Sequence, residues 1–259
     1  MSKKTIKMAV PKGSLQKLTG EFFSKSGIPL EGYGVEVRNY RPTIEIPGVE
    51  IKVLRPQEIP VLISRGYYDI GISGLDWYEE SRCQRNVQDI LDLKYGKVDI
   101  VLAVPDNWDD VTKPEELFNK FDAYGRSLRI WTEYLNLTEE FIFNFLDMEP
   151  TILSPYQMLS RGRHSPVILF HSFGATESKP PEDGEAIVDN TSTGGTLRAN
   201  GLKIIHKLLP NSTARLFVNR RSLQDQEKQE RIDIIKSSLS KNVPDKFENN
   251  QAFKGHISW

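Results

Sequence analysis

The chain has 259 residues, of which 38% are hydrophobic and 27% charged, and its formal net charge is −1 at pH 7. This composition predicts a globular protein that is long enough for a substantial core and for two lobes. The near-neutral charge and the lack of a long apolar run give no support to binding of nucleic acid or a membrane, and the single cysteine, Cys83, excludes an intrachain disulfide and a cysteine-based zinc site.

The first predicted strand, 6–10, follows a short polar N-terminus with no apolar leader segment, so we expect a cytoplasmic protein. Lys12 and Gly13 come next, and apolar residues at helical spacing then predict a helix that ends at Gly27. A lysine and a glycine between a strand and a helix N-terminus suit a site for anionic groups. A merely solvated lysine is the alternative interpretation of Lys12.

Residues 49–79 predict a second βα block, with a strand at 49–54, a helix that opens at 55–60 and a strand at 68–74. Asp76 then begins a helix with the spacing of a capping box. Glycines at 71 and 74 allow a ligand to approach the backbone, which makes Asp69, Gly71 and Gly74 candidate binding residues. Capping and turn formation are equally good explanations of Asp69 and Asp76.

Further strands are predicted at 97–105 and 167–170, and Pro105 to Asn107 have the composition of a hinge into a second lobe. Between these two strands lies a polar segment, 155–165, which we expect to be a solvated surface loop. A strand at 213–219 and a helix at about 223–239, with apolar residues on one face, complete the regular part.

The most informative stretch is 186–202, where a buried strand (186–188) leads through a hydroxyl- and glycine-rich turn into a short helix that ends at Gly201. Unpaired amides and the positive end of the dipole at a helix N-terminus suit a phosphate monoester. Gly194 and Gly195 are expected to adopt positive φ so that successive amides converge on one anion. Asp189, at the strand end, suits a sugar diol. A polar turn with a helix cap is the alternative.

These residues resemble the signature of the ATP phosphoribosyltransferase family, an acidic residue followed by Thr-Gly-x-Thr-Leu and then Arg-Ala-Asn-Gly-Leu. The sequence matches at Asp189, Thr193-Gly194, Thr196-Leu197 and 198–202. Similar segments lie at Lys12-Gly13, 55–74, 94–96, 132–138 and Gly174 to Glu177, so the resemblance covers about residues 5–240. Four positions depart from the family pattern. Ser14 replaces an arginine, Glu133 a basic residue, Leu135 a proline and Asn190 an aliphatic residue.

The resemblance implies an α/β, two-lobed fold like that of periplasmic binding proteins, with mainly parallel sheets and a cleft between the lobes. Lobe one would combine 1–104 with 203–245, lobe two would be 105–202, and 246–259 would be a tail. After Asn242 only 17 residues remain, too few for the ACT-like regulatory domain of the family's long form, so the short form is expected. A homo-oligomer, a dimer or larger, is expected, and a separate regulatory subunit stays open.

The resemblance also implies the reaction, which joins N1 of ATP to C1 of phosphoribosyl pyrophosphate and releases pyrophosphate with the help of Mg²⁺. Positioning and electrostatic stabilisation would then dominate, and no protein metal cluster is predicted, because the four histidines are scattered. Asp189 and Lys12 would be catalytic, the first on the ribose hydroxyls and the second facing pyrophosphate. The predicted substrate-binding residues are Ser192, Thr193, Gly194, Gly195, Thr196, Glu177, Asp69, Gly71 and Gly74.

Two other functions stay open on the sequence alone. The departures at Ser14, Glu133 and Asn190 are also compatible with a divergent phosphoribosyltransferase that acts on another heterocycle. A non-catalytic nucleotide-binding regulatory paralogue on the same fold is the third possibility. Turnover with ATP, turnover with another acceptor, and donor binding without turnover would distinguish the three.

Overall fold

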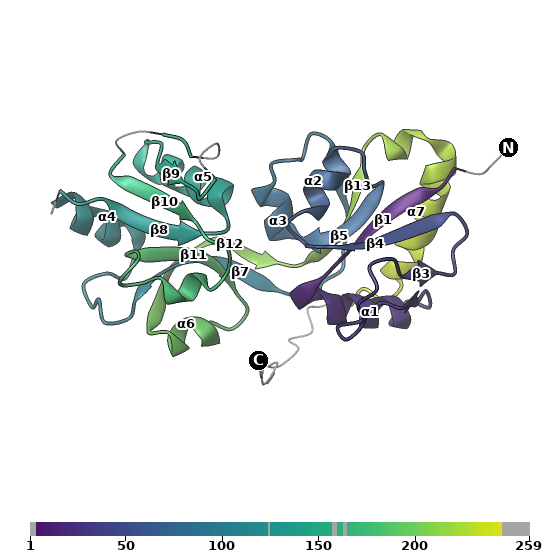
Figure 1. Ribbon diagram of the computed structural model, residues 1–259, viewed down its shortest axis with the longest axis horizontal. Helices are drawn as coiled ribbons and strands as arrows, with labels where there is room; N and C mark the ends of the chain where they lie inside the picture. Colours follow the sequence, from purple (N-terminus) through teal and green to yellow (C-terminus); the bar gives the residue numbers. More distant parts are fainter. Residues whose placement is uncertain (1–3, 124, 157–159, 163–164, 245–259) are drawn as a thin grey trace.

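The computed structural model describes residues 4–123, 125–156, 160–162 and 165–244, which form two lobes side by side (Figure 1). Each lobe is built on one β-sheet with helices packed on it. The predicted tail, 246–259, lies outside the described residues, as do 157–159 and 163–164 of the polar segment at 155–165.

The first lobe contains a five-stranded sheet in the order β4-β1-β5-β13-β6. β1 pairs in parallel with β4 and β5, whereas β13 is antiparallel to both β5 and β6. The strands are β1 (Ile6–Pro11), β4 (Val49–Leu54), β5 (Ile70–Gly74), β6 (Val87–Asp92) and β13 (Ala214–Asn219), beside a small pair, β2 (Leu30–Glu31) and β3 (Thr43–Ile44). The helices are α1 (Gln16–Lys25), α2 (Ile59–Ser64), α3 (Leu75–Glu80) and α7 (Gln226–Ser240), with short 3-10 turns at Gly13–Leu15 and Ser222–Gln224.

The second lobe contains a six-stranded sheet in the order β12-β7-β11-β8-β10-β9. The pairs β11–β8, β8–β10 and β10–β9 are parallel, and β7 is antiparallel to its neighbours β12 and β11. The strands are β7 (Val98–Pro105), β8 (Leu128–Thr132), β9 (Thr151–Leu153), β10 (Val167–His171), β11 (Ala186–Thr191) and β12 (Leu202–Ser212). The helices are α4 (Pro114–Ala123), α5 (Leu135–Leu146) and α6 (Gly195–Ala199), and Thr176–Ser178 forms a 3-10 turn.

The boundaries between the lobes differ from the sequence-based boundaries at 104/105 and 202/203. β7 and β12 pair with each other from Leu202↔Pro105 to Ser212↔Val98, and both belong to the second sheet. The chain therefore crosses between the lobes at 93–97 and at 212–214, where the Ala214 amide donates to the Tyr95 carbonyl at 2.9 Å. The composition of 105–107 suggested a hinge, but these residues form a turn at the outer end of β7 because β12 continues the sheet there.

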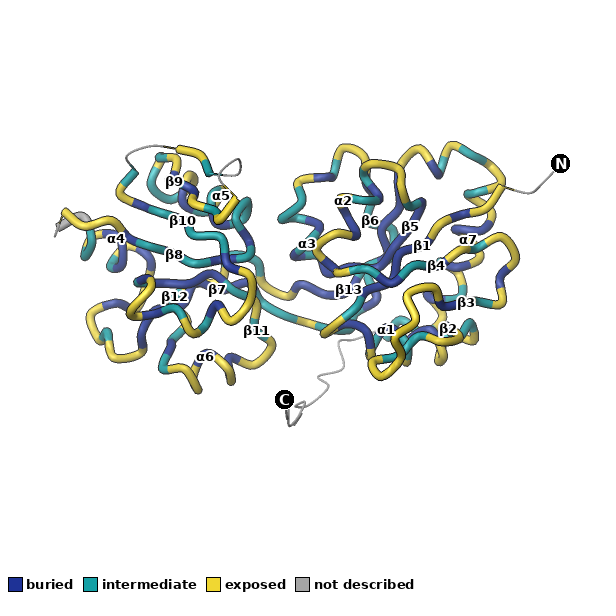
Figure 2. The backbone as a smooth tube through the Cα atoms, viewed as in Figure 1, coloured by how far each residue is buried: buried dark blue, intermediate teal, exposed yellow. Residues whose placement is uncertain are grey.

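Each lobe has its own hydrophobic core, visible as the dark central strands in Figure 2. In the first lobe the apolar face of α7 packs on the sheet through Ile232, Ile235 and Leu239, as its helical spacing predicted. The expected two-lobed α/β fold is thus confirmed. No helix in the described ranges has the length and apolar character that crossing a bilayer requires.

The carboxyl ends of the parallel strands of the two sheets meet where the lobes touch. Tyr134, just after β8, is hydrogen-bonded to Asp76, just after β5, at 2.8 Å. Gln57, after β4, donates to Glu133, after β8, at 3.5 Å. We call this region the interlobe junction. In open α/β sheets, ligands bind to residues that follow the carboxyl ends of strands. A predicted site residue is therefore expected to lie at the interlobe junction.

Candidate active site

The turn between β11 and α6 has the strand–turn–helix order that the sequence predicts. Gly194 precedes the helix with a φ of +71°, in the left-handed region that glycine adopts without strain. A Cβ on Gly194 would lie 2.8 Å from Nη1 of Arg198, the end of a flexible side chain, so the backbone conformation is the main reason for glycine here. Gly195 begins α6 and has no positive φ, which corrects the expectation for that residue, because only one left-handed residue is needed to turn the chain.

Two amides of the 191–196 loop donate to hydroxyl groups of the loop itself. Gly194 N donates to Thr191 Oγ1 at 2.8 Å, and Gly195 N donates to Thr193 Oγ1 at 3.3 Å. The guanidinium of Arg198 donates to the Thr193 carbonyl at 3.0 Å and so ties the first turn of α6 to the loop. These bonds give the loop a fixed shape. An anion could accept from the same two amides if the threonine side chains rotated away.

Asp189, at the end of β11, is a carboxylate whose charge is strongly disfavoured. Its pKa is raised to about 7, mainly by burial. The hydrogen bond from the Asn190 backbone amide, at 2.7 Å, opposes this shift, and the charges of Glu133 and Glu177 contribute to it. Glu177 lies in the 3-10 turn Thr176–Ser178, and Glu133 follows β8. The structure thus brings the predicted residues Asp189 and Glu177 together and shows that the departure at Glu133 adds charge at this site.

Lys12 follows β1 at the carboxyl edge of the first sheet. Its ammonium group donates to Tyr40 Oη at 2.6 Å and lies 4.5 Å from the centre of the Tyr40 ring. The hydrogen bond and charge of Lys12 lower the pKa of Tyr40, and the charges of Arg55 and Arg38 contribute to the shift. Arg55 Nη1 lies 3.7 Å from the position of a Cβ on Gly13.

Arg55 is a candidate residue that the sequence reasoning missed. It follows β4 as Lys12 follows β1, and the last residues of these parallel strands, Leu54 and Pro11, are paired. The rule that parallel strands end at one edge of a sheet would have placed the two cations side by side. Arg55 therefore supplies a guanidinium near the position where Ser14 has replaced the arginine of the family pattern.

A buried hydrogen-bonded network crosses the interlobe junction. Asp76 is 4% exposed, and its carboxylate accepts from Ser212 Oγ at 2.7 Å and from Tyr134 Oη at 2.8 Å. Tyr134 is fully buried, stacks on Trp77 with ring centres 4.4 Å apart, and accepts from Asn190 Nδ2 at 3.1 Å. Asp76 is the second residue of α3 and not its cap, because the buried hydroxyl donors bind the carboxylate instead.

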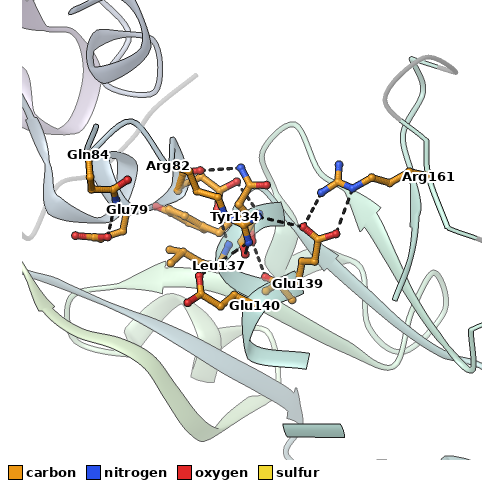
Figure 3. Close-up of polar contacts among 11 residues, drawn as sticks. Glu79, Arg82, Gln84, Tyr134, Leu137, Glu139, Glu140 and Arg161 are labelled. Carbon is orange, nitrogen blue, oxygen red and sulfur yellow. Dashed lines mark hydrogen bonds and ion pairs between the residues drawn. The ribbon is translucent and has the colours of Figure 1, made fainter. Parts of the chain in front are cut away.

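A second set of contacts joins α3 to the N-terminus of α5. Glu80 accepts from the amides of Asn136 and Leu137, both at 2.9 Å, so a residue of the first lobe caps a helix of the second. Arg82 donates to the Asn136 carbonyl at 2.9 Å and lies within ion-pair distance of Glu139 and Glu140. Figure 3 shows Arg82 directed at these acids, with Arg161 on the other side of Glu139.

Three predicted binding residues have structural roles that explain them. Asp69 lies at the amino end of β5, away from the interlobe junction, and accepts from Lys7 N at 2.8 Å and from Ser222 Oγ and Lys228 Nζ at 2.7 Å. A Cβ on Gly71 would lie 2.8 Å from Ile59 Cγ2, so this glycine permits helix packing. We do not retain Asp69 and Gly71 as ligand residues. Gly74 does lie at the junction, where a Cβ would collide with Asp76 Oδ1 at 2.0 Å.

Among the described residues, no three His, Cys, Asp or Glu side chains converge to hold a metal ion. Cys83 is buried and accepts from Ser81 Oγ at 2.9 Å, and burial raises the pKa of its thiol, as expected of an unreactive cysteine. Glu133 and Glu177 lie close enough to Asp189 for their charges to raise its pKa. This arrangement suits a divalent ion bound mainly by substrate oxygens with one or two carboxylates, a common mode for Mg²⁺.

Comparisons with known proteins identify the family. The sequence profile of ATP phosphoribosyltransferase matches residues 55–241. The ATP phosphoribosyltransferase of Desulforudis audaxviator is 35% identical over 232 residues, 88% of this chain and 69% of the relative. That of Thermodesulfovibrio yellowstonii is 34% identical over 240 residues, 91% of this chain and 71% of the relative.

Solved structures agree on the fold. The ATP phosphoribosyl transferase (HisG:HisZ) complex from Thermotoga maritima aligns with a TM-score of 0.68 at 21% identity and covers 92% of this chain and 98% of that one. The alkanesulfonate-binding protein SsuA from Xanthomonas axonopodis pv. citri aligns with a TM-score of 0.50 at 9% identity, covering 92% of this chain and 72% of that one. The architecture is therefore shared with periplasmic binding proteins.

The fold and the sequence relatives together define a glycosyltransferase of the phosphoribosyltransferase class. The chain belongs to the ATP phosphoribosyltransferase family. Its reaction transfers the 5-phosphoribosyl group of phosphoribosyl pyrophosphate to N1 of ATP with release of pyrophosphate, which is the first step of histidine biosynthesis. The family enzyme requires a divalent metal.

Proposed function

We propose that the 191–196 loop binds the 5′-phosphate of phosphoribosyl pyrophosphate. The observation that carries this proposal is the left-handed Gly194, which turns the chain from β11, the strand that contains Asp189, into the N-terminus of α6. An incoming phosphate would accept from amides and hydroxyls of the loop, and the threonine hydroxyls that hold two of these amides would rotate to donate to it. The residues involved are Ser192, Thr193, Gly194, Gly195 and Thr196.

Asp189 accepts hydrogen bonds from the ribose hydroxyls in this proposal. Its pKa of about 7 places the free enzyme near half-ionisation at neutral pH, and two hydroxyl donors would favour the ionised form. A carboxylate fixed beside C1 also stabilises the positive charge that develops on the sugar as the bond to pyrophosphate breaks. N1 of ATP attacks directly, so no protein nucleophile is needed.

Lys12 binds the pyrophosphate group, and Arg55 joins it as a second cation. Both follow parallel strands at the carboxyl edge of the first sheet, and the 191–196 loop follows β11 at the carboxyl edge of the second. The departing pyrophosphate gains negative charge, which these cations and the divalent ion, Mg²⁺ in this proposal, neutralise. Glu177 contributes to the acceptor pocket, because it lies close enough to Asp189 to raise its pKa.

A separate regulatory subunit is suggested by one structural relative. The Thermotoga maritima enzyme is a HisG:HisZ complex, so a separate regulatory subunit is proposed for this chain as well, together with a homo-oligomeric catalytic part. A cytoplasmic location agrees with biosynthetic enzymes of this family.

The test compares two glycines of the same conformation. Gly194→Ala and Gly27→Ala introduce the same left-handed strain, since φ is +71° and +75°, but Gly27 lies at the end of α1 with open space around it. Turnover is followed as formation of the N1-adduct from ATP, phosphoribosyl pyrophosphate and Mg²⁺. We expect Gly194→Ala to raise the KM for the donor at least tenfold and Gly27→Ala to leave it unchanged.

Equal donor KM values for the two variants would refute the assignment of the phosphate site. Turnover only with another heterocyclic acceptor would instead support the divergent enzyme, and donor binding without turnover the regulatory paralogue. The double variant Thr193→Ala, Gly194→Ala is expected to weaken donor binding further.

A further inference from the structure

Asn190 occupies a position that no part of the proposed chemistry uses, yet its amide group joins two functional regions. Asn190 Nδ2 lies 3.3 Å from Asp189 Oδ1 and 3.1 Å from Tyr134 Oη, so one amide group reaches both the candidate ribose-binding carboxylate and the buried phenol. The side chain comes from β11, whereas Tyr134 follows β8.

The phenol of Tyr134 connects Asn190 to the first lobe through Asp76. Tyr134 Oη donates to Asp76 Oδ2 at 2.8 Å and therefore offers its oxygen lone pair to Asn190 Nδ2. Its ring stacks on Trp77, and its backbone amide donates to Thr132 Oγ1 at 2.8 Å. Tyr134 is fully buried, so its hydroxyl keeps one orientation.

The far end of the network lies at the crossing between the lobes. Ser212, which is fully buried and ends β12, donates to Asp76 Oδ1 at 2.7 Å and accepts from Asp76 N at 2.9 Å. The chain crosses into the first lobe immediately after Ser212. A continuous row of hydrogen bonds thus runs from the crossing segment through Asp76, Tyr134 and Asn190 to Asp189.

We propose that Asn190 is a positioning residue, which fixes the Asp189 carboxylate through Tyr134 and Asp76 when the two lobes are docked. The inference rests on the proposed role of Asp189 in binding the ribose. An aliphatic side chain at position 190, the usual one in the family pattern, has no donor and leaves Asp189 without this tie. In this chain, Asn190 therefore makes the orientation of the Asp189 carboxylate depend on contacts at the interlobe junction.

The proposal is tested with Asn190→Val, because Val keeps a β-branched residue that suits a strand and removes both amide hydrogen bonds. We expect kcat/KM for phosphoribosyl pyrophosphate to fall about three- to tenfold, the change that loss of one hydrogen bond of ordinary strength produces. Asn190 is exposed, so the melting temperature should stay unchanged. Asn86→Val is the matched control, since Asn86 is an exposed amide in the first lobe that donates to Ser64 Oγ at 3.3 Å.

A second variant shows whether Asn190 acts through the phenol. Tyr134→Phe keeps the ring on Trp77 and removes the hydroxyl. If the network is continuous, Asn190→Val should cause a much smaller fall in kcat/KM in the Tyr134→Phe background than in the wild type, as a double-mutant cycle measures. Equal effects in both backgrounds would contradict the link. If Tyr134→Phe does not fold, the comparison of Asn190→Val with Asn86→Val still decides.

The variant Asp189→Asn tests the ribose-binding role of Asp189 separately from the positioning role of Asn190. If Asp189→Asn leaves donor kinetics unchanged, the ribose-binding role itself is wrong. If Asp189→Asn impairs the donor step while Asn190→Val behaves like Asn86→Val, the site stands and the positioning role of Asn190 is refuted.

Discussion

Removal of the Glu80 carboxylate should weaken the contact between α5 and the first lobe. α5 begins after Tyr134, whose side chain makes no capping hydrogen bond, and its second and third amides donate to Glu80 at 2.9 Å each. Substitution of a capping side chain by alanine costs about 1–2 kcal/mol. For a chain of this size that corresponds to a fall in melting temperature of roughly 2–8 °C. We therefore expect Glu80→Ala to lower the melting temperature by this amount at pH 8, as measured by differential scanning calorimetry.

The stability of the protein should also depend on pH through the protonation of Glu80. The pKa of Glu80 is raised to about 7, mainly by burial. The two amides and Arg82 oppose the shift, and the charge of Glu139 contributes to it. The folded protein therefore holds a proton that the unfolded chain releases near pH 4.5, and the stability that this proton confers is lost as the pH rises through 7. Glu80→Gln cannot titrate, so the melting temperature of the wild type relative to Glu80→Gln should fall between pH 5 and pH 8.

Glu79→Ala is the matched control, because Glu79 lies in the same helix and accepts from Gln84 Nε2 at 2.8 Å within the first lobe. Its effect should be smaller and should not depend on the contact between lobes. Equal melting temperatures for Glu80→Ala and the wild type, together with a pH-independent difference between the wild type and Glu80→Gln, would show that the cap does not form in solution.

Three further predictions concern the site and its surroundings. Glu133→Gln removes a charge that raises the pKa of Asp189, so the acidic limb of kcat/KM for the donor should move to lower pH; an unmoved limb would place Glu133 away from Asp189. Asp69→Asn should destabilise the fold by weakening the ion pair with Lys228, at 2.7 Å, while donor and acceptor KM values stay unchanged; a raised KM would restore it as a ligand residue. Arg55→Ala should raise the donor KM at least fivefold in steady-state assays, whereas no change would exclude it from the pyrophosphate site.

Strand and turn patterns predicted the local part of this structure well. Residues 49–54 form the strand that their alternation indicates, and the 186–202 stretch has the expected strand–turn–helix order. These features depend on neighbours in the sequence. Asp69 was misjudged because its partners, Ser222 and Lys228, lie about 150 residues away, and a buried acid at a strand end looks the same in sequence whether it binds a cation of the protein or a ligand.

The contacts between the lobes could not be predicted, because they depend on how two sheets approach each other. Glu80 had no signal as a cap, since the helix that it caps starts 55 residues later in the other lobe. The boundary near Pro105 was misplaced for a related reason. A proline followed by polar residues marks a turn equally well at a hinge and at the outer end of a strand, and only the pairing of β7 with β12 decides between them.

The most direct test of the account is a crystal structure of the protein with phosphoribosyl pyrophosphate and Mg²⁺. We predict that the 5′-phosphate accepts from amides and hydroxyls of the 191–196 loop, that the ribose hydroxyls donate to Asp189, and that the pyrophosphate extends toward Lys12 and Arg55. A donor bound elsewhere, or a loop whose amides remain on Thr191 and Thr193 with the phosphate in another place, would contradict the central claim.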